Sequence, residues 1–348
     1  MAGQATCAEA GCRSRPAHGY PEPVTQTPVA PVSTGTHGAP PTASPDGRRS
    51  RPPGPRTPRR RSTIQAYIAL TKPRIIELLL VTTLPAMILA AGGLPAWNVV
   101  AVTLVGGTLA AGSANALNCY VDRDIDAMMR RTGHRPLARH DVSPRGALIF
   151  GVLLGIVSVL VMGLVTNWLA AGLTAAAIAF YVVVYTMLLK RRTAQNIVWG
   201  GAAGCMPVLI GWAAVTDRLS WAALAMFGIV FFWTPPHFWA LAIRYREDYA
   251  RASVPMLPVV AAPLRVAREI VAYAWLTVAT TLVLWPLATG WVYGALAAIA
   301  GVALLGSAYR LLIRTKRGEN AKPMQLFHLS NSYLAFVFVA IAVDTFLR

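Results

Sequence analysis

Charged residues are scarce in this chain, and their scarcity excludes whole classes of protein. Only 13% of the 348 residues are Asp, Glu, Lys or Arg, whereas soluble domains carry roughly 25%. Hydrophobic residues make up 55% of the chain and come in long runs. This composition excludes a soluble globular enzyme, and it excludes a wholly disordered chain, which would be poor in apolar residues. It is typical of a polytopic membrane protein.

Cysteine and acidic residues are also few. Four cysteines in a chain of this length exclude a disulfide scaffold, and no Cys/His pair at zinc-ligand spacing follows Cys7 and Cys12. The 14 acidic residues stand against 32 basic ones, which gives a formal charge of +18. Such a charge first suggests nucleic-acid binding, so the positions of the basic residues along the chain decide what it means.

The N-terminal segment differs in composition from the rest. The first 60 residues hold 12 of the 25 prolines and end in an arginine-rich cluster. So little apolar surface cannot offset the chain entropy lost on folding, and no apolar stretch typical of a secretory signal follows Met1. We predict a disordered, Pro/Arg-rich cytoplasmic tail over residues 1–62, with its arginines near anionic lipid. The alternative is a mitochondrial transit peptide, which would place the protein in the mitochondrial inner membrane.

Nine apolar stretches follow the tail, and each is near the roughly 20 residues that a helix needs to cross the hydrocarbon of a bilayer. We therefore predict an all-α fold over residues 63–348, a polytopic membrane helix bundle with about nine transmembrane helices. The predicted spans are 75–92, 97–121, 146–164, 168–189, 195–215, 221–243, 267–288, 290–311 and 326–346.

The basic residues are distributed unequally between the two sides of the predicted bundle. With the N-terminus in the cytoplasm, 30 of the 32 lie on the inner side, and only Arg218 and Arg348 lie outside. This positive-inside bias predicts a multi-pass protein of the bacterial plasma membrane with a cytoplasmic N-terminus. Because topology accounts for much of the charge, membrane lipid is an expected partner and nucleic acid is not. An RNA-associated protein would also need aromatic residues among the basic ones, and residues 21–60 have almost none.

Three polar residues at helical spacing end the second predicted span. Asn118, Asp122 and Asp126 fall at i, i+4 and i+8, so on a helix they line one face. Neighbouring carboxylates repel one another unless a cation lies between them, and Mg²⁺ takes one or two carboxylates together with phosphate oxygens. The spacing fits a magnesium-bound phosphorylated ligand, with Arg131 and Arg135 as phosphate clamps. It fits equally well a charged helix end that pairs with its own arginines.

Two further clusters fall on the same predicted side of the membrane. The Lys-Arg-Arg run at 190–192 follows the fourth span and is either topogenic or phosphate-binding. Glu247-Asp248 follows the sixth span and supplies a second acidic pair. His237 comes directly after two prolines, which break a helix and would turn the imidazole toward a cavity and a substrate. The competing interpretation is an ordinary core histidine hydrogen-bonded to backbone.

At these motifs the chain resembles the UbiA-type intramembrane prenyltransferase superfamily and, within it, the protohaem IX farnesyltransferases. The superfamily pattern Asn-x-x-x-Asp-x-x-x-Asp is matched by Asn118, Asp122 and Asp126. The subfamily segments are matched at 70–74, 122–137, 185–197 and 233–258, of which Trp-Thr-Pro-Pro-His-Phe-Trp at 233–239 is the most specific. The resemblance covers about 65–348. The second acidic motif departs from the superfamily's spaced aspartate pair, since only Glu247-Asp248-Tyr249 stands there.

The resemblance implies a Mg²⁺-dependent enzyme of haem biosynthesis. Farnesyl diphosphate would ionise, its farnesyl group would join a vinyl group of haem b, and water would complete the addition to give haem O. Haem b would be a substrate and not a cofactor, and a haem A synthase serving terminal oxidases would act downstream. By this resemblance the catalytic residues are Asn118, Asp122, Asp126 and Asp248, and the three aspartates are the metal ligands. The expected substrate-binding residues are Lys72, Arg74, Arg131, Arg135, Lys190, Arg191, His237 and Tyr249.

Two other functions compete with this one. A related prenyltransferase acting on a quinone or chlorin precursor would share the first motif, but the segment at 233–239 argues against it. A non-catalytic haem carrier or transporter would show an internal repeat with broken helices at the midplane. No such repeat is present, and the ionisable residues gather at one face.

Overall fold

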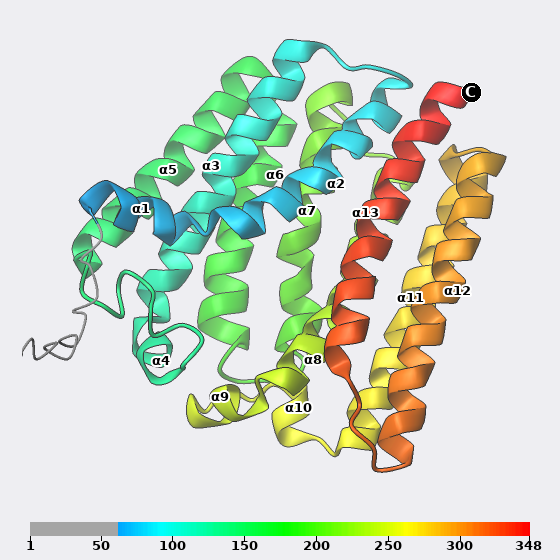
Figure 1. Cartoon of the computed structure of the whole chain (residues 1–348). Coiled ribbons are helices and arrows are strands. Elements are labelled where there is room, and N and C mark those ends of the chain that lie inside the picture. Colours follow the sequence, from blue (N-terminus) through cyan, green and yellow to red (C-terminus); the bar gives the residue numbers. More distant parts are fainter. Residues whose placement is uncertain (1–61) are drawn as a thin grey trace, which may run out of the picture. The chain divides into compact units, whose positions relative to one another are not determined.

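The computed structural model describes residues 62–348, with the side chains of 74–80 excepted. The predicted tail lies outside the described residues, apart from Ser62. The described part is helical (Figure 1). Its elements are α1 (Thr63–Thr71), α2 (Pro73–Ala91), α3 (Trp97–Val121), α4 (Arg123–Met128), α5 (Pro144–Val165), α6 (Trp168–Ala179), the π-helix η1 (Phe180–Leu189), α7 (Asn196–Thr216), α8 (Trp221–Arg244), α9 (Arg246–Arg251), α10 (Leu257–Val260), α11 (Pro263–Ala288), α12 (Trp291–Lys316) and α13 (Pro323–Leu347).

The long helices confirm the predicted all-helical, multi-span architecture. Among the described residues, eight helices are long and apolar enough to cross a membrane, with α6 and η1 counted as one span from Trp168 to Leu189. The first predicted span corresponds to α2, of which Val81–Ala91 is described as a shorter apolar helix. Sequence reasoning did not predict the short helices α1, α4, α9 and α10, because they are too short to show a periodic apolar face.

Local sequence fixes where several spans begin. Ser143, Asn167 and Ser220 are N-caps whose side chains accept hydrogen bonds from backbone N–H groups in the first turns of α5, α6 and α8. These bonds satisfy donors that a helix start otherwise leaves without a partner. Pro263 and Pro323 open α11 and α13, where the missing N–H costs no hydrogen bond. The apolar runs therefore become helices with defined ends.

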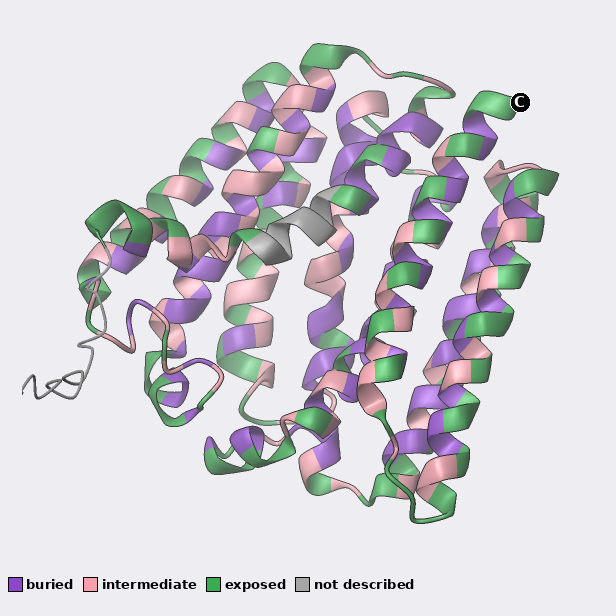
Figure 2. Ribbon diagram, viewed as in Figure 1, coloured by how far each residue is buried: buried purple, intermediate pink, exposed green. Residues whose placement is uncertain are grey.

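The bundle buries one side of each long helix and exposes the other (Figure 2). α3 packs mainly on α5, α8 on α11 and α7, and α12 on α11 and α13. The largest hydrophobic core joins α7, α8, α11, α12 and α13. Large apolar side chains such as Ile149, Ile299 and Val302 point outward, as expected where the surrounding solvent is lipid.

A π-helical turn and one glycine bring η1 close to α7. The Thr186 hydroxyl donates to the carbonyl of Tyr181, five residues earlier, at 2.8 Å. A Cβ at Gly200 of α7 would overlap the ring of Tyr185. Only glycine allows this approach, and π-helical turns recur at functional sites. Tyr181 and Tyr185 both line the cavity described next.

Candidate active site

A cavity of about 540 Å³ lies inside the bundle, with walls from α3, η1, α7, α8 and α13. Eight of the residues predicted to form the site line it: Lys72, Asn118, Asp126, Arg131, Arg135, Lys190, His237 and Tyr249. Asp122, Asp248 and Arg191 are not among its lining residues. Arg74 lies outside the residues whose side chains the structure describes. We call the part of the lining around Asn118, Arg135 and Lys190 the charged end of the cavity, and the part around Trp233, His237 and Phe327 the aromatic end.

The acidic motif spans the joint between two helices. α3 ends at Val121, as the second predicted span does, and α4 starts at Arg123. The backbone hydrogen bonds continue across the joint, because Asp122 N donates to Asn118 O and Asp126 N donates to Asp122 O, each at 2.9 Å. The i, i+4 spacing is therefore kept although the helix is interrupted.

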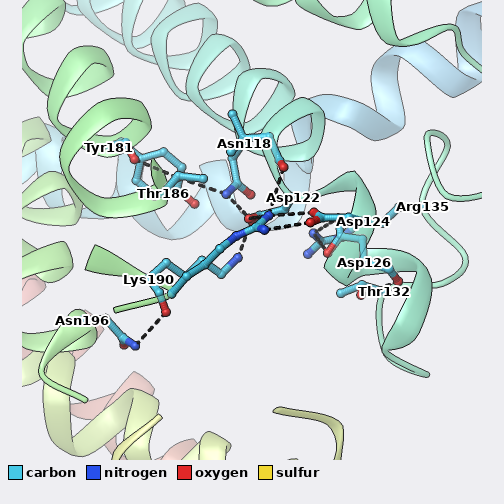
Figure 3. Close-up of polar contacts among 12 residues, drawn as sticks. Asn118, Asp122, Asp124, Asp126, Thr132, Arg135, Tyr181, Thr186, Lys190 and Asn196 are labelled. Carbon is cyan, nitrogen blue, oxygen red and sulfur yellow. Dashed lines mark hydrogen bonds and ion pairs between the residues drawn. The ribbon is translucent and has the colours of Figure 1, made fainter. Parts of the chain in front are cut away.

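Asn118 connects three elements at the charged end (Figure 3). Its Nδ2 donates to Asp122 Oδ2 at 2.7 Å and to the Thr186 hydroxyl of η1 at 3.2 Å. Its Oδ1 accepts a hydrogen bond from Lys72 Nζ at 3.0 Å. Lys72 stands between α1 and α2 with φ +52°. One amide thus positions a cation from before α2 and a carboxylate at the end of α3.

Cations stand against the carboxylates of the motif. Lys190 Nζ is hydrogen-bonded to Asp122 Oδ2, and Arg135 Nη1 donates to both oxygens of Asp126 at 2.7 and 2.6 Å. These contacts match the expectation of a helix end paired with basic residues. They do not satisfy every oxygen, however: Oδ1 of the fully buried Asp122 has no hydrogen-bond partner. The nearest cationic group paired with it, Arg191 Nη2, is 3.8 Å away.

Arg191 points to the outer side of this cluster. It forms a two-pronged ion pair with Asp124, with both nitrogen–oxygen distances 2.7 Å. The hydrogen bonds from Arg191 lower the pKa of Asp124 to about 2. Asp124 remains more than half exposed, so this pair is weak. Arg191 therefore joins the connection after η1 to α4 and is not among the residues that line the cavity.

The second acidic segment supports Arg131. Asp248 in α9 accepts a hydrogen bond from the backbone N–H of Arg131 at 3.3 Å and also pairs with Arg251. The Arg131 guanidinium donates to the Tyr249 hydroxyl at 3.3 Å and stacks over that ring and the ring of Tyr245. The Nε of Arg131 is buried without a partner. The two acidic motifs are thus joined through this arginine and not through one carboxylate cluster.

Burial changes the acid–base behaviour of Lys72. Burial lowers the pKa of Lys72 from 10.5 to about 8, because a charged ammonium loses its hydration. The positive charge of this side chain therefore titrates close to neutral pH in the ligand-free protein. Part of the positive charge at this end of the cavity depends on pH.

The aromatic end is built around His237. Its ring is stacked between Trp233 and Phe327, with ring centroids 4.3 and 4.4 Å away. Nδ1 lies 2.9 Å from the Ser330 hydroxyl, which itself donates to the carbonyl of Phe327 at 2.8 Å. When the hydroxyl proton is directed to the Phe327 carbonyl, the hydroxyl oxygen accepts from Nδ1–H and Nε2 keeps a lone pair. The prolines before His237 do not end α8, contrary to prediction.

The residues at the charged end fit a magnesium ion together with a phosphorylated ligand. Within residues 62–348, no group of three or more His, Cys, Asp or Glu side chains forms a metal site by itself. Mg²⁺ usually takes only one or two carboxylates and completes its shell with phosphate oxygens and water. Asp122 and Asp126 are one helical turn apart, and the unpartnered Oδ1 of Asp122 is the kind of oxygen that such an ion binds. Asp248 is bonded elsewhere.

Sequence reasoning missed part of the cavity wall. Tyr181, Asn115 and Asn331 line the cavity, and Oδ1 of Asn331 is buried without a partner. The adjacent Ser330 and Asn331 interrupt the apolar run of α13. Polar residues inside a membrane span are costly and often functional. Ser330 and Asn331 could therefore have been predicted from the sequence as candidate site residues.

The sequence has close relatives. The model of the UbiA prenyltransferase family matches residues 79–331. The chain is 62% identical over 304 residues to protoheme IX farnesyltransferase 1 of Saccharopolyspora erythraea, a match that covers 87% of this chain and 97% of that protein. It is 57% identical over 289 residues to protoheme IX farnesyltransferase of Streptomyces coelicolor, which covers 82% of this chain and 92% of the relative.

Solved structures share the fold at low sequence identity. A digeranylgeranylglyceryl phosphate synthase aligns with a TM-score of 0.69 at 14% identity, over 82% of this chain and 99% of the other. A UbiA homologue from Archaeoglobus fulgidus, bound to GPP and Mg²⁺, aligns with a TM-score of 0.56 at 16% identity, over 79% and 99% of the two chains. At such identities the likeness shows the fold alone.

Proposed function

The chain belongs to the UbiA prenyltransferase family, and from that premise we propose that it transfers the farnesyl group of farnesyl diphosphate to a vinyl group of haem b, giving haem O. The relatives named protoheme IX farnesyltransferase, 57–62% identical to it, support this acceptor. The structural observation that carries the proposal is one cavity with a charged end suited to a diphosphate and an aromatic end suited to a flat, apolar ring.

The charged end would bind the diphosphate. Lys72, Arg135 and Lys190 all line the cavity there and would exchange their contacts with carboxylates and amide for phosphate oxygens. Arg131 has an unpartnered buried Nε and is held in place by Asp248 and Tyr249. Asp122 and Asp126 would hold Mg²⁺, with Asn118 fixing Asp122. When bound, the ion would stabilise negative charge on the departing diphosphate.

The proposed reaction breaks one carbon–oxygen bond and forms one carbon–carbon and one carbon–oxygen bond. The bond between C1 of farnesyl and its oxygen breaks, and the electron pair leaves with diphosphate. C1 joins the terminal vinyl carbon of haem, and water adds to the other vinyl carbon with loss of one proton. The faces of Tyr181 and Tyr185, whose ring centroids are 5.3 Å apart, would stabilise the allylic cation. The cationic residues would stabilise the charge that develops on the leaving group.

The aromatic end would receive haem b. Trp233 and Phe327 hold the His237 imidazole flat, and Ser330 fixes its tautomer, so that Nε2 presents a lone pair without rearrangement. We propose that His237 contacts and orients haem through this atom. A ring fixed in advance loses little entropy on binding.

The membrane placement of the site follows from its basic residues. α4, α9, α10 and the α12–α13 turn lie at the same end of the described helices (Figure 1). Because this end carries most of the basic residues, we propose that it faces the cytoplasm of a bacterial plasma membrane. Farnesyl diphosphate would enter from there, and haem O would pass on to a haem A synthase.

A product assay tests the function. Membranes containing the full chain are incubated with haem b, farnesyl diphosphate and Mg²⁺, with and without EDTA, and the haems are resolved by chromatography and mass. We expect a haem heavier by farnesyl plus water, absent with EDTA. A product with another aromatic acceptor but none with haem b would overturn the acceptor. Haem binding without any product would support a carrier instead.

A further inference from the structure

A second cavity lies on the outside of the bundle, between α12 and α13. Its volume is about 560 Å³, and none of its lining residues lines the reaction cavity. On α12 the wall contains Val302, Gly306, Arg310 and Arg314, which are each four residues apart and share one helix face. The facing wall contains Lys322, which directly precedes α13, and Leu326 and Leu329 of α13. We call this cavity the α12–α13 groove.

The mouth of the groove is cationic and lacks a counter-charge. Arg310, Arg314 and Lys322 form no ion pair within residues 62–348, and the nearby Glu319 pairs instead with Arg317, at 3.8 Å. Arginines at i and i+4 repel each other. Nη1 of Arg314 is also buried without a hydrogen-bond partner, which is costly for a charged donor. An anion placed among these side chains would offset their mutual repulsion and give Arg314 Nη1 a partner.

Beyond the mouth the groove is apolar. Val302 lies eight residues before Arg310 on α12, roughly 12 Å along the helix axis at 1.5 Å per residue, and its side chain is 74% exposed. A Cβ built at Gly306 would meet nothing within 4 Å, so the groove is open there. A free phosphate would use only the mouth, whereas a phosphate attached to a hydrocarbon chain would use the whole length.

We propose that the α12–α13 groove binds an anionic glycerophospholipid. Its phosphate lies among Arg310, Arg314 and Lys322, and one acyl chain runs along the groove past Gly306 to Val302. Charge complementarity selects this occupant, because basic pockets between membrane helices attract the anionic head groups of the cytoplasmic leaflet. The lipid would hold α12 against α13, whose Phe327 and Asn331 line the reaction cavity.

Native mass spectrometry of the full chain tests this proposal without reference to catalysis. The protein is released from neutral detergent after titration with phosphatidylglycerol, with phosphatidylcholine of the same chains, or with inorganic phosphate. We expect phosphatidylglycerol to bind preferentially. The variant R310Q/K322Q should weaken it by about fivefold for each removed charge. Arg317→Gln is the control, because it removes one positive charge from the end of α12 outside the groove.

A second variant tests the acyl chain alone. Gly306→Leu fills the open floor and leaves all three cations in place, and the free space around Gly306 lets it fold. We expect it to lose phosphatidylglycerol binding. Equal binding of phosphatidylcholine, or equal losses in R310Q/K322Q and Arg317→Gln, would overturn the proposal. So would unchanged binding in Gly306→Leu, or inorganic phosphate that displaces the lipid completely, because the mouth would then be a plain anion site.

Discussion

The two ends of the reaction cavity are built on opposite principles. At the charged end, cations are held against carboxylates and an amide, and Lys190 and Arg135 bind oxygens of the two aspartates that are proposed to hold the metal. At the aromatic end, His237 is held by stacking and one neutral hydrogen bond. In the first arrangement, the cations are paired with protein groups, and a bound diphosphate would take over some of those contacts. The second fixes a geometry and needs no counter-ion. The difference shows how one cavity would serve a diphosphate donor and a flat aromatic acceptor.

The largest expected effect lies at the charged end. Asp122→Asn removes the charge of a buried carboxylate while keeping its shape, and we expect activity to fall about 10²–10³-fold, the usual cost of losing one group that stabilises the transition state. The measurement is haem O formed per unit of correctly inserted protein. Asp124→Asn is the control, because the Asp124 side chain is more than half exposed and is not a proposed metal ligand. Equal activity of both variants would contradict the assignment of Asp122 to metal and diphosphate.

The next effect should be confined to the aromatic end. His237→Gln removes the Nε2 lone pair, and we expect the KM for haem b to rise about tenfold or more, since one specific contact is worth ~1–3 kcal/mol. The KM for farnesyl diphosphate should not change. Steady-state kinetics with each substrate varied in turn separates the two. His328→Ala, at an exposed position of α13, is the control. A parallel rise in both KM values would mean that the two ends do not work separately.

The pH dependence should belong to the charged end only. Burial lowers the pKa of Lys72 to about 8, so its charge is present below that pH and lost above it. We expect the KM for farnesyl diphosphate to rise about tenfold between about pH 7 and about pH 9, as one charge-assisted hydrogen bond is lost. Lys72→Arg keeps its charge over this range and should flatten the profile. A profile that Lys72→Arg leaves unchanged would assign the titration to another group.

The smallest effect concerns how the two ends are joined. Gly200 of α7 packs against Tyr185 and Gly201 against Thr234 of α8, so these glycines let both walls approach. Gly200→Ala should destabilise the fold by about 1–3 kcal/mol through overpacking, seen as a Tm lower by a few degrees in detergent. Gly204→Ala, where a Cβ meets nothing within 4 Å, should leave the Tm unchanged. Equal Tm values would show that η1 adjusts without cost.

Much of the site could be foreseen because its signals are local. The spacing of Asn118, Asp122 and Asp126 survives the break between α3 and α4, since the backbone hydrogen bonds continue. The hydrogen-bonding and ion-pair partners of these residues could not be predicted from the sequence. Nothing in the sequence says that Arg135 rather than Arg131 reaches Asp126, or that Asp248 supports Arg131, because such pairings depend on how loops fold back between helices.

The sequence by itself determined the membrane spans, their helical form and the types of charge gathered at one end. The length of an apolar run and the spacing of residues along a helix are properties of the chain alone. In a bilayer, a long apolar segment forms a helix because its backbone polar groups must be hydrogen-bonded within the segment. Only the tertiary structure decided which carboxylate oxygen stays unpartnered, which nitrogen of His237 keeps its lone pair, and that Asp122 and Asp248 do not line the cavity. These facts depend on packing between helices far apart in the sequence, where a shift of one ångström changes which atoms can form a hydrogen bond.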